Sequence, residues 1–163
     1  MILLAQTQLT EAARRRIEDI LFGLKVLFEE ISPLIERYTS EVCPDCENVC
    51  CIQRHAYYDG EDMIYISARG LSVPEYSERG LEEPCEFLSF KGCSRPGWQR
   101  PFRCTWYFCG PLLQHMNDGP GRPHRRLVGL LQDIVELRSE LVSAAGKQNP
   151  ETVILNLFQN LSG

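Results

Sequence analysis

The sequence has no long apolar run, and its basic residues are fewer than its acidic ones. None of its hydrophobic stretches approaches the roughly 18–20 residues that a membrane-spanning helix needs, so we expect no membrane segment. The 163 residues include 17 Lys and Arg against 22 Asp and Glu, which gives a formal charge of −5. This balance argues against a polybasic membrane binder or a dedicated nucleic-acid coat protein, and we do not expect nucleic acid as a partner.

Signals for export and for common catalytic machinery are also missing. The first apolar residues, 1–5, have no basic residue before them and give way to Gln6, so we predict no secretory signal and a cytoplasmic protein. The sequence has no glycine-rich cofactor loop, no nucleophile elbow and no internal repeat. It therefore indicates no catalytic residue, and it leaves open whether the protein is an enzyme.

The composition is that of an ordinary globular chain. Hydrophobic residues make up 44% of the sequence and charged residues 24%, which is typical of folded rather than disordered proteins. A chain of this length buries roughly 68–70% of its unfolded surface, enough for one hydrophobic core. We therefore predict one domain over residues 1–163.

Two segments have the periodicity of amphipathic helices. Apolar residues recur in steps of three and four over residues 10–38, after Thr10 as a candidate N-cap, and again over residues 124–146. Pro33 lies inside the first pattern and predicts a kink, or a junction of two helices, near Ser32. The tail, residues 147–163, is apolar in part, and its sequence is compatible with a short docking helix or a mobile end.

The segment between these helices, residues 39–123, holds all eight cysteines and eight of the ten prolines. Prolines and glycines at this density predict turns and short elements rather than long helices. Residues 63–67 have the composition of a short β-strand, and residues 87–92 predict a hairpin that leads to Cys93. Residues 101–108 predict a short helix with a proline in its first turn.

Eight cysteines are the most unusual feature of the chain. They fall into two groups, separated by residues 52–84. The first group comprises Cys43, Cys46, Cys50 and Cys51, and the second comprises Cys85, Cys93, Cys104 and Cys109. In a reducing cytosol such a cluster indicates a metal site or a catalytic centre, whereas a disulfide framework is the alternative for a secreted chain.

The spacing within the first group favours metal. Two thiolates separated by two residues converge on one ion through a tight turn, as in zinc sites, and Pro44 stiffens this turn by fixing its own backbone angle φ. The side chains of Cys50 and Cys51 diverge because they are adjacent in sequence. We expect them to serve different metals or different edges of a cluster, unless one of them is not a ligand.

The second group brings the number of possible thiolate ligands to eight, and its spacing sets a condition on the structure between Cys104 and Cys109. Cys104 and Cys109 bind one centre only if the intervening helix ends between them, as Gly110 and Pro111 indicate. Eight thiolates suit two four-cysteine zinc sites, or one four-thiolate iron–sulfur cluster with four cysteines left over. We predict all eight cysteines as metal ligands. The predicted fold class is mainly α, with two amphipathic helical segments flanking an irregular, cysteine-rich, metal-organised middle that contains a small hairpin.

The cysteine motifs resemble those of the YkgJ-type cysteine-cluster family, which is described as a zinc- or iron-chelating domain and is named for a CxxCxxCC motif. Cys43 to Cys51 match this motif with one additional residue before the Cys-Cys pair. Cys85 and Cys93, with Gly92 before Cys93, match a second segment of the family pattern. A third segment is matched by Arg100, Pro101, Cys104 and Cys109. The resemblance covers residues 43–109 and implies a metal-chelating domain.

Three functional classes follow from these observations. The first, which we favour, is a metal-binding accessory or interaction module that holds zinc or an iron–sulfur cluster, with its protein partner and oligomeric state left open. The second is an iron–sulfur redox or transferase enzyme, since one branch of the family resembles a flagellin lysine methylase. The third is a zinc-dependent nucleic-acid binder that would use the basic residues 122–126.

Several other side chains are candidates for supporting roles. His55 is the histidine nearest the first cysteine group and a candidate ligand, whereas His115 and His124 are expected in surface or structural roles. Arginines among the later cysteines would offset thiolate charge or solvate a loop: Arg95, Arg100 and Arg103. Four aromatic residues are expected to cover the cysteine site and exclude water: Trp98, Phe102, Trp106 and Phe108.

Overall fold

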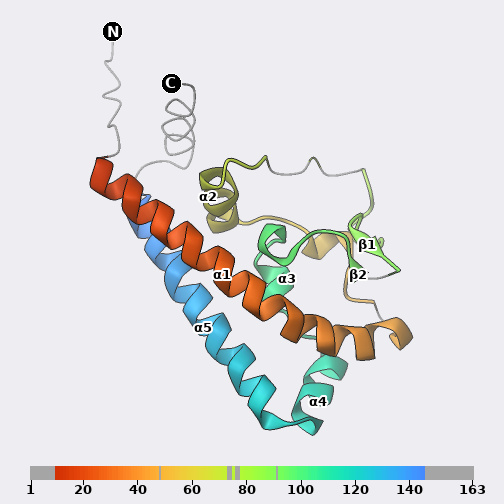
Figure 1. The fold of residues 1–163 in the computed structure, drawn as a ribbon. Coiled ribbons are helices and arrows are strands. Elements are labelled where there is room, and N and C mark those ends of the chain that lie inside the picture. Colours follow the sequence, from red (N-terminus) through yellow and green to blue (C-terminus); the bar gives the residue numbers. More distant parts are fainter. Residues whose placement is uncertain (1–9, 48, 73–74, 76–77, 91, 146–163) are drawn as a thin grey trace.

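The computed structural model describes residues 10–47, 49–72, 75, 78–90 and 92–145. This part of the chain is mainly helical, with five α-helices and one two-stranded antiparallel hairpin (Figure 1). No helix within these residues is both long enough and apolar enough to span a membrane. The predicted tail, residues 147–163, lies outside the described residues.

The longest helix, α1, spans Glu11–Val42. The hydroxyl of Thr10 accepts a hydrogen bond from the backbone N–H of Ala13 at 3.2 Å, which confirms the predicted N-cap. The helix continues through Pro33, so the alternative of two separate helices is wrong. Pro33 removes only one backbone donor, and the buried side chains of Phe28 and Ile35 on either side hold the helix against the core. Figure 1 shows the axis of α1 changing direction in its second half, as a kink requires.

Helix α5, Gly121–Ala144, runs antiparallel beside α1, and α4, Gly110–Asp118, leads into it (Figure 1). Gly23 of α1 permits the close approach, because a Cβ atom there would lie 3.0 Å from Leu137 Cδ1 of α5. Burial of each large apolar side chain between the helices contributes about 1.5–3 kcal/mol. These side chains include Ile17, Leu24, Phe28, Ile31, Leu127, Leu130, Ile134 and Leu141.

Helix α2, Gly60–Ala68, replaces the strand that we expected over residues 63–67. Its start is a capping box, in which the N–H of Asp62 donates to Asp59 Oδ1 at 2.8 Å. The N–H of Asp59 donates in return to Asp62 Oδ2 at 3.2 Å. The short apolar run over residues 63–67 fits either structure, and the capping box before it favours the helix.

The remaining elements are short and agree with the sequence. Strands β1, Leu88–Ser89, and β2, Gly92–Cys93, form the predicted hairpin, with Leu88 opposite Cys93. Gly92 has a φ of 97°, in the left-handed region that glycine adopts without strain. Helix α3, Arg103–Trp106, lies within the predicted helical segment 101–108.

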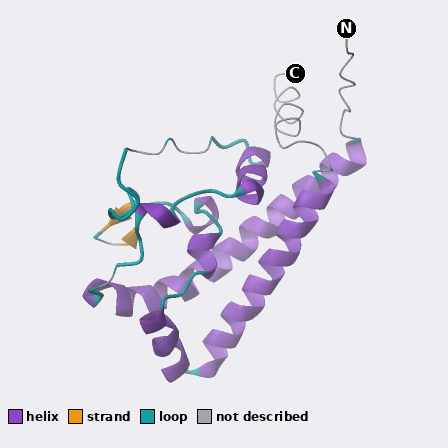
Figure 2. Ribbon diagram, turned by 180° about the vertical axis from the view of Figure 1, so that it is seen from behind, coloured by secondary structure: helices purple, strands orange, loops and turns teal. Residues whose placement is uncertain are grey.

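The hairpin and α3 lie near the second half of α1. Figure 2 shows the hairpin on the opposite side of α1 from α5, and Figure 1 agrees from the front. A 3₁₀ turn at Cys43–Asp45 continues directly from the end of α1. The long helix is therefore the element from which the cysteine-rich segment begins and against which much of it packs.

Candidate metal centre

Backbone hydrogen bonds join the two cysteine groups. The N–H of Cys85 donates to the carbonyl oxygen of Cys51 at 2.9 Å, and the N–H of Gln53 donates to the carbonyl of Glu83 at 2.9 Å. This pairing forms an isolated antiparallel bridge. Pro84 lies in the paired segment and has no N–H to extend a ladder. Two parts of the chain that are distant in sequence thus lie side by side, with a cysteine from each group at the junction.

A buried glutamine stabilises the same junction through two hydrogen bonds. Gln53 is only 1% exposed, and its Nε2 donates to Glu86 Oε1 at 3.1 Å. Its Oε1 accepts a hydrogen bond from the backbone N–H of Glu86 at 3.2 Å. Both ends of the amide are satisfied, as a buried polar group requires. Gln53 was not predicted as part of the site.

Helix ends position three cysteines. Cys43 follows the last residue of α1, and the N–H of Cys46 donates to the carbonyl of Cys43 at 3.3 Å, which closes a tight turn as expected for C-x2-C. Cys109 is the N-cap residue of α4 and packs against the hydrophobic core. Because α4 packs against α1, these helix ends bring together the two outermost cysteines of the sequence, Cys43 and Cys109.

His55 lies between the two cysteine groups. Its ring Nδ1 is 2.9 Å from the carbonyl oxygen of Cys50, and its own carbonyl oxygen accepts a contact from the Cys104 thiol at 3.8 Å. Its ring also lies against that of Tyr107, with the ring centres 5.3 Å apart. The backbone and ring of His55 therefore help to fix one cysteine from each group. Its role as a ligand stays a prediction.

Three neighbouring thiols act on the thiol of Cys43. Burial raises the pKa of Cys43, and the neighbouring thiols of Cys50, Cys109 and Cys46 raise it further. Like charges that lie close together disfavour the thiolate form in this way.

The adjacent pair Cys50 and Cys51 shares a hydrogen bond. The thiol of Cys51 donates to the sulfur of Cys50 and lowers the pKa of Cys50 to about 6, although burial acts in the opposite direction. The thiol of Cys109 also contacts the sulfur of Cys50. The pKa of Cys51 is raised, first by this hydrogen bond and then by burial. The two sulfur atoms therefore lie close together although we expected the side chains to diverge.

Cys85, Cys93 and Cys104 form the rest of the cluster. Burial raises the pKa of Cys104 to about 12, with further contributions from Cys93 and Cys85, while the guanidinium of Arg100 acts in the opposite direction. Arg100 is thus one of the arginines that we expected to offset thiolate charge. Arg103 lies over the ring of Tyr107, with 5.8 Å between its guanidinium carbon and the ring centre.

All eight cysteines lie among the described residues, and none of them forms a disulfide. Each is partly or substantially exposed. No three His, Cys, Asp or Glu side chains in the described part of the chain converge closely enough to hold a metal ion as they stand. The fold therefore gathers the two cysteine groups, whereas the sulfur atoms do not adopt a ligand arrangement.

Most of the aromatic residues that we expected over the cysteines contact the hydrophobic core, and their role as a cover for the cysteines stays a prediction. Trp98, Phe102 and Phe108 pack against the hydrophobic core, and Trp106 is 47% exposed. Because these aromatics flank Cys104 and Cys109 in sequence, their burial anchors the second cysteine group to the helices.

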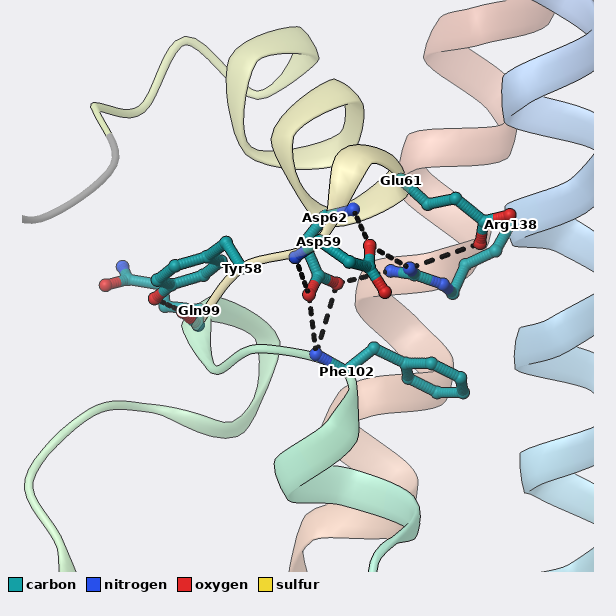
Figure 3. A network of polar contacts seen from close by, with 7 residues as sticks. All are labelled: Tyr58, Asp59, Glu61, Asp62, Gln99, Phe102 and Arg138. Carbon is teal, nitrogen blue, oxygen red and sulfur yellow. Dashed lines mark hydrogen bonds and ion pairs between the residues drawn. The ribbon is translucent and has the colours of Figure 1, made fainter. Parts of the chain in front are cut away.

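A buried ion pair that we did not predict connects this region to α5 (Figure 3). Arg138 is 3% exposed, and its Nη1 lies 2.8 Å from Asp62 Oδ1. The same carboxylate oxygen accepts a hydrogen bond from the backbone N–H of Phe102 at 3.1 Å. Burial raises the pKa of Asp62, and Arg138 acts against that rise. The pair links α2 and α5 to the segment that leads to Cys104.

Two acidic residues and one ring complete the surroundings of Arg138. Its Nη2 lies 3.4 Å from Asp59 Oδ1 and 3.3 Å from Glu61 Oε2. Its guanidinium carbon lies 4.4 Å from the centre of the Phe102 ring. The sequence does contain a signal for this residue, because Arg138 lies on the buried stripe of α5, four residues after Ile134. An arginine on such a stripe requires a buried partner.

The basic residues 122–126 and two histidines make local contacts. Arg126 pairs with Glu30 of α1 at 2.7 Å, so part of the basic patch is engaged within the protein. His115 Nε2 lies 2.7 Å from Glu41 Oε2, which agrees with a surface role. His124 is half-buried near the start of α5.

Comparison of the chain with protein-family models, curated proteins and solved structures gave no match. The resemblance to the YkgJ-type family therefore stays a prediction that rests on the cysteine motifs. The cysteine cluster is the feature of this chain that bears most directly on function.

Proposed function

We propose that this protein binds zinc or an iron–sulfur cluster through its cysteine thiolates. One observation carries the proposal: the hydrogen bond between Cys85 and Cys51 brings together two cysteine groups that are distant in sequence. A single local turn, or two cysteines that are close by chance, would not bring cysteines of both groups to one place. The proposed ligands are Cys43, Cys46, Cys50, Cys51, Cys85, Cys93, Cys104 and Cys109.

The chemistry of the donor set supports this function. Thiolates are soft ligands that favour zinc and iron–sulfur centres over magnesium or calcium. Several thiolates packed together repel one another, and a bound cation would remove this penalty. The guanidinium of Arg100 lies near Cys104 and would offset part of the negative charge that a four-thiolate centre retains. Since the sulfur atoms do not converge as they stand, we expect a metal to draw them together.

The position of the cysteines favours a structural metal in an accessory or interaction module. They lie at helix ends, in turns and beside a hairpin of two-residue strands, and such elements have little stability of their own. A metal bound there would contribute folding free energy that short elements lack.

Elemental analysis of protein purified without oxygen tests the proposal. We expect at least about one metal per chain, with the thiols reduced and protected from alkylation until a chelator is added. Zinc would leave the protein colourless, whereas an iron–sulfur cluster would absorb visible light and contain sulfide. Cys85→Ser should lower the metal content, and Ser94→Ala, beside Cys93 on the same hairpin, is the matched control. Metal-free protein with its cysteines oxidised in pairs would refute the proposal.

A further inference from the structure

A row of apolar residues on helix α5 lies beside the core rather than in it. The row comprises Val128, Leu131, Val135 and Val142, whose spacings of three, four and seven residues place them along one side of the helix. Val128 is 42% exposed and Val135 is 52% exposed, while the other two are half-buried. We call these four residues the outer row of α5. A continuous apolar row on a helix surface is typical of a face that another element covers.

The outer row points away from α1. Three residues of α5 contact α1, namely Arg126, Leu137 and Glu140. At about 100° of rotation for each residue, Leu137 and Glu140 lie on the opposite side of the helix from Val135. The longest helix of the molecule therefore leaves the outer row uncovered.

The sequence that follows α5 predicts a second helix after a short turn. Helix α5 ends with Ala145 as its C-cap, and Gly146 comes next in the sequence. Asn149 is a candidate N-cap, Pro150 suits the first helical position, and Glu151 suits the first turn. Apolar residues then recur in steps of one, three and four: Ile154, Leu157, Phe158 and Leu161. These residues lie outside the described part of the chain, and their pattern predicts an amphipathic helix over residues 150–161.

We propose that residues 150–161 pack as a helix on the outer row of α5, antiparallel to it. Two helices joined by a few residues, here 146–149, pack as antiparallel neighbours. A helix of 12 residues is about 18 Å long, and Val128 and Val142 are about 21 Å apart along α5. The tail therefore has the length and the direction to cover the row. The inference does not depend on the proposed metal-binding function.

Two arguments favour the tail on this row over other arrangements. A segment tethered by a short linker has an effective concentration in the millimolar range, which a second copy of the chain or another protein would have to exceed. The exposed Phe22 of α1 is a less suitable place for the tail, because it is a single apolar side chain beside a hollow that the charged residues Glu18 and Arg69 help to line. The outer row is then a contact within the chain and not a surface for a partner protein.

A photo-crosslinking residue tests the contact directly. Val135→p-benzoylphenylalanine in the full-length, reduced chain should crosslink on illumination to residues 150–161 of the same chain. Mass spectrometry of the digested protein identifies the crosslinked segment, and the yield should not depend on protein concentration. The matched control is the same photoreactive residue at Glu136, which is exposed and points about 100° away from Val135. Its yield on residues 150–161 should be at least about tenfold lower, because it lies off the outer row.

Hydrogen exchange with single and paired changes gives a second readout. In the full chain, amides over residues 153–161 should exchange at least about tenfold more slowly than in a free peptide of the same sequence. Val135→Lys should remove this protection, whereas Glu136→Lys, which changes the charge more, should not. Leu157→Asp/Phe158→Asp should remove it from the side of the tail, with Asn156→Asp/Gln159→Asp as the control on the other face of the predicted helix. Circular dichroism of each variant checks that α1 and α5 are retained.

The remaining outcomes overturn the proposal in different ways. If residues 153–161 exchange as fast as the free peptide in the unaltered chain, the tail does not dock. If they are protected and Val135→Lys leaves that protection unchanged, the tail packs elsewhere. If the residue at position 135 crosslinks only to a second copy of the chain, the outer row is an interface between copies. None of these results bears on the metal content, so the failure of this inference and the failure of the proposed function are distinguishable.

Discussion

The helices α1 and α5 differ from the cysteine-rich segment between them in what stabilises their structure. Between the helices lie large apolar side chains that are almost completely buried, such as Leu24 and Ile134. Residues 43–58 and 75–109, where the cysteines lie, bury few apolar side chains among the described residues and depend on turns, a two-residue hairpin and isolated hydrogen bonds. The comparison indicates that the hydrophobic core sets the helical frame, whereas the cysteine-rich segment needs another source of stability.

Beside the aromatic side chains that pack on the core, two specific contacts join the regions. The ion pair between Arg138 and Asp62 joins α5 to the segment before Cys104, and Gly97 lies against Ser32 of α1. Changes at these contacts should affect both regions, while changes within one region should leave the other largely intact. Unfolding measurements on variants of each kind distinguish these two cases.

The largest effect should come from Arg138→Met. Removing one partner of a buried ion pair leaves Asp62 without its closest cation, which destabilises proteins by about 3–5 kcal/mol. Urea unfolding under reducing conditions would measure this loss. A cost within the range of an exposed substitution, about 0.5 kcal/mol, would show that the pair does not couple the two regions.

A core truncation should be next in size and should affect the helical frame. Leu24 is 0% exposed, and Leu24→Ala leaves a cavity that costs about 2–5 kcal/mol. Phe22→Ala is the matched control on the same helix, since Phe22 is 70% exposed and its loss should cost much less. Thermal unfolding followed by circular dichroism compares the two, and equal losses would contradict the assignment of the core.

Alanine at two glycines should have opposite effects in the two regions. In Gly97→Ala the new Cβ would overlap the hydroxyl of Ser32, and overpacking of this kind costs about 1–3 kcal/mol. In Gly129→Ala, inside α5, nothing lies within 4 Å of the new atom, so the higher helix propensity of alanine should stabilise the protein by about 0.5–1 kcal/mol.

Unfolding in urea gives both values. Ser32→Ala should relieve part of the Gly97→Ala defect because it removes the overlapping hydroxyl, and failure of this rescue would contradict the packing of Gly97 on α1. Gly97→Ala should also lower the metal content of the protein if the packing of Gly97 on α1 positions Cys104.

The smallest effect concerns the pH dependence of stability at the contact between the regions. Burial raises the pKa of Asp62 above its ordinary value of 3.8. A carboxyl with a raised pKa in the folded state stabilises that state most below its unfolded pKa, and this contribution is lost as pH rises through the folded value. Relative to Asp62→Asn, the unaltered protein should therefore lose stability between pH 3.8 and neutral pH. A difference that grows in the opposite direction would show that Arg138 outweighs burial.

Much of the helical frame could be predicted from the sequence, because long apolar periodicities and a hydroxyl cap are local signals. The hairpin was predictable for the same reason, with Gly92 at its turn. The strand predicted over residues 63–67 was wrong because a short run of four apolar residues fits a helix as well, and the capping box of Asp59 and Asp62 favours the helix. Local patterns therefore predicted the long elements better than the short ones.

The sequence identifies the eight cysteines as a candidate site, but it does not predict how they are arranged in space. Spacing identifies residues that converge through a single turn, such as Cys43 and Cys46. It contains no information on the pairing of Cys51 with Cys85 or on the approach of Cys109 to Cys43, since both depend on how distant segments pack. Gln53 and the partners of Arg138 were missed for the same physical reason.

Hydrogen exchange with and without a chelator, under reducing conditions, tests the comparison most directly. After metal removal, the amides of Gln53 and Cys85 should lose their protection because they join the two cysteine groups. Amides in α1 and α5 around Leu24 and Ile134 should keep theirs, since the hydrophobic core holds them. Protection that is unchanged throughout, or that falls equally in both regions, would contradict the claim that metal stabilises the cysteine-rich segment selectively.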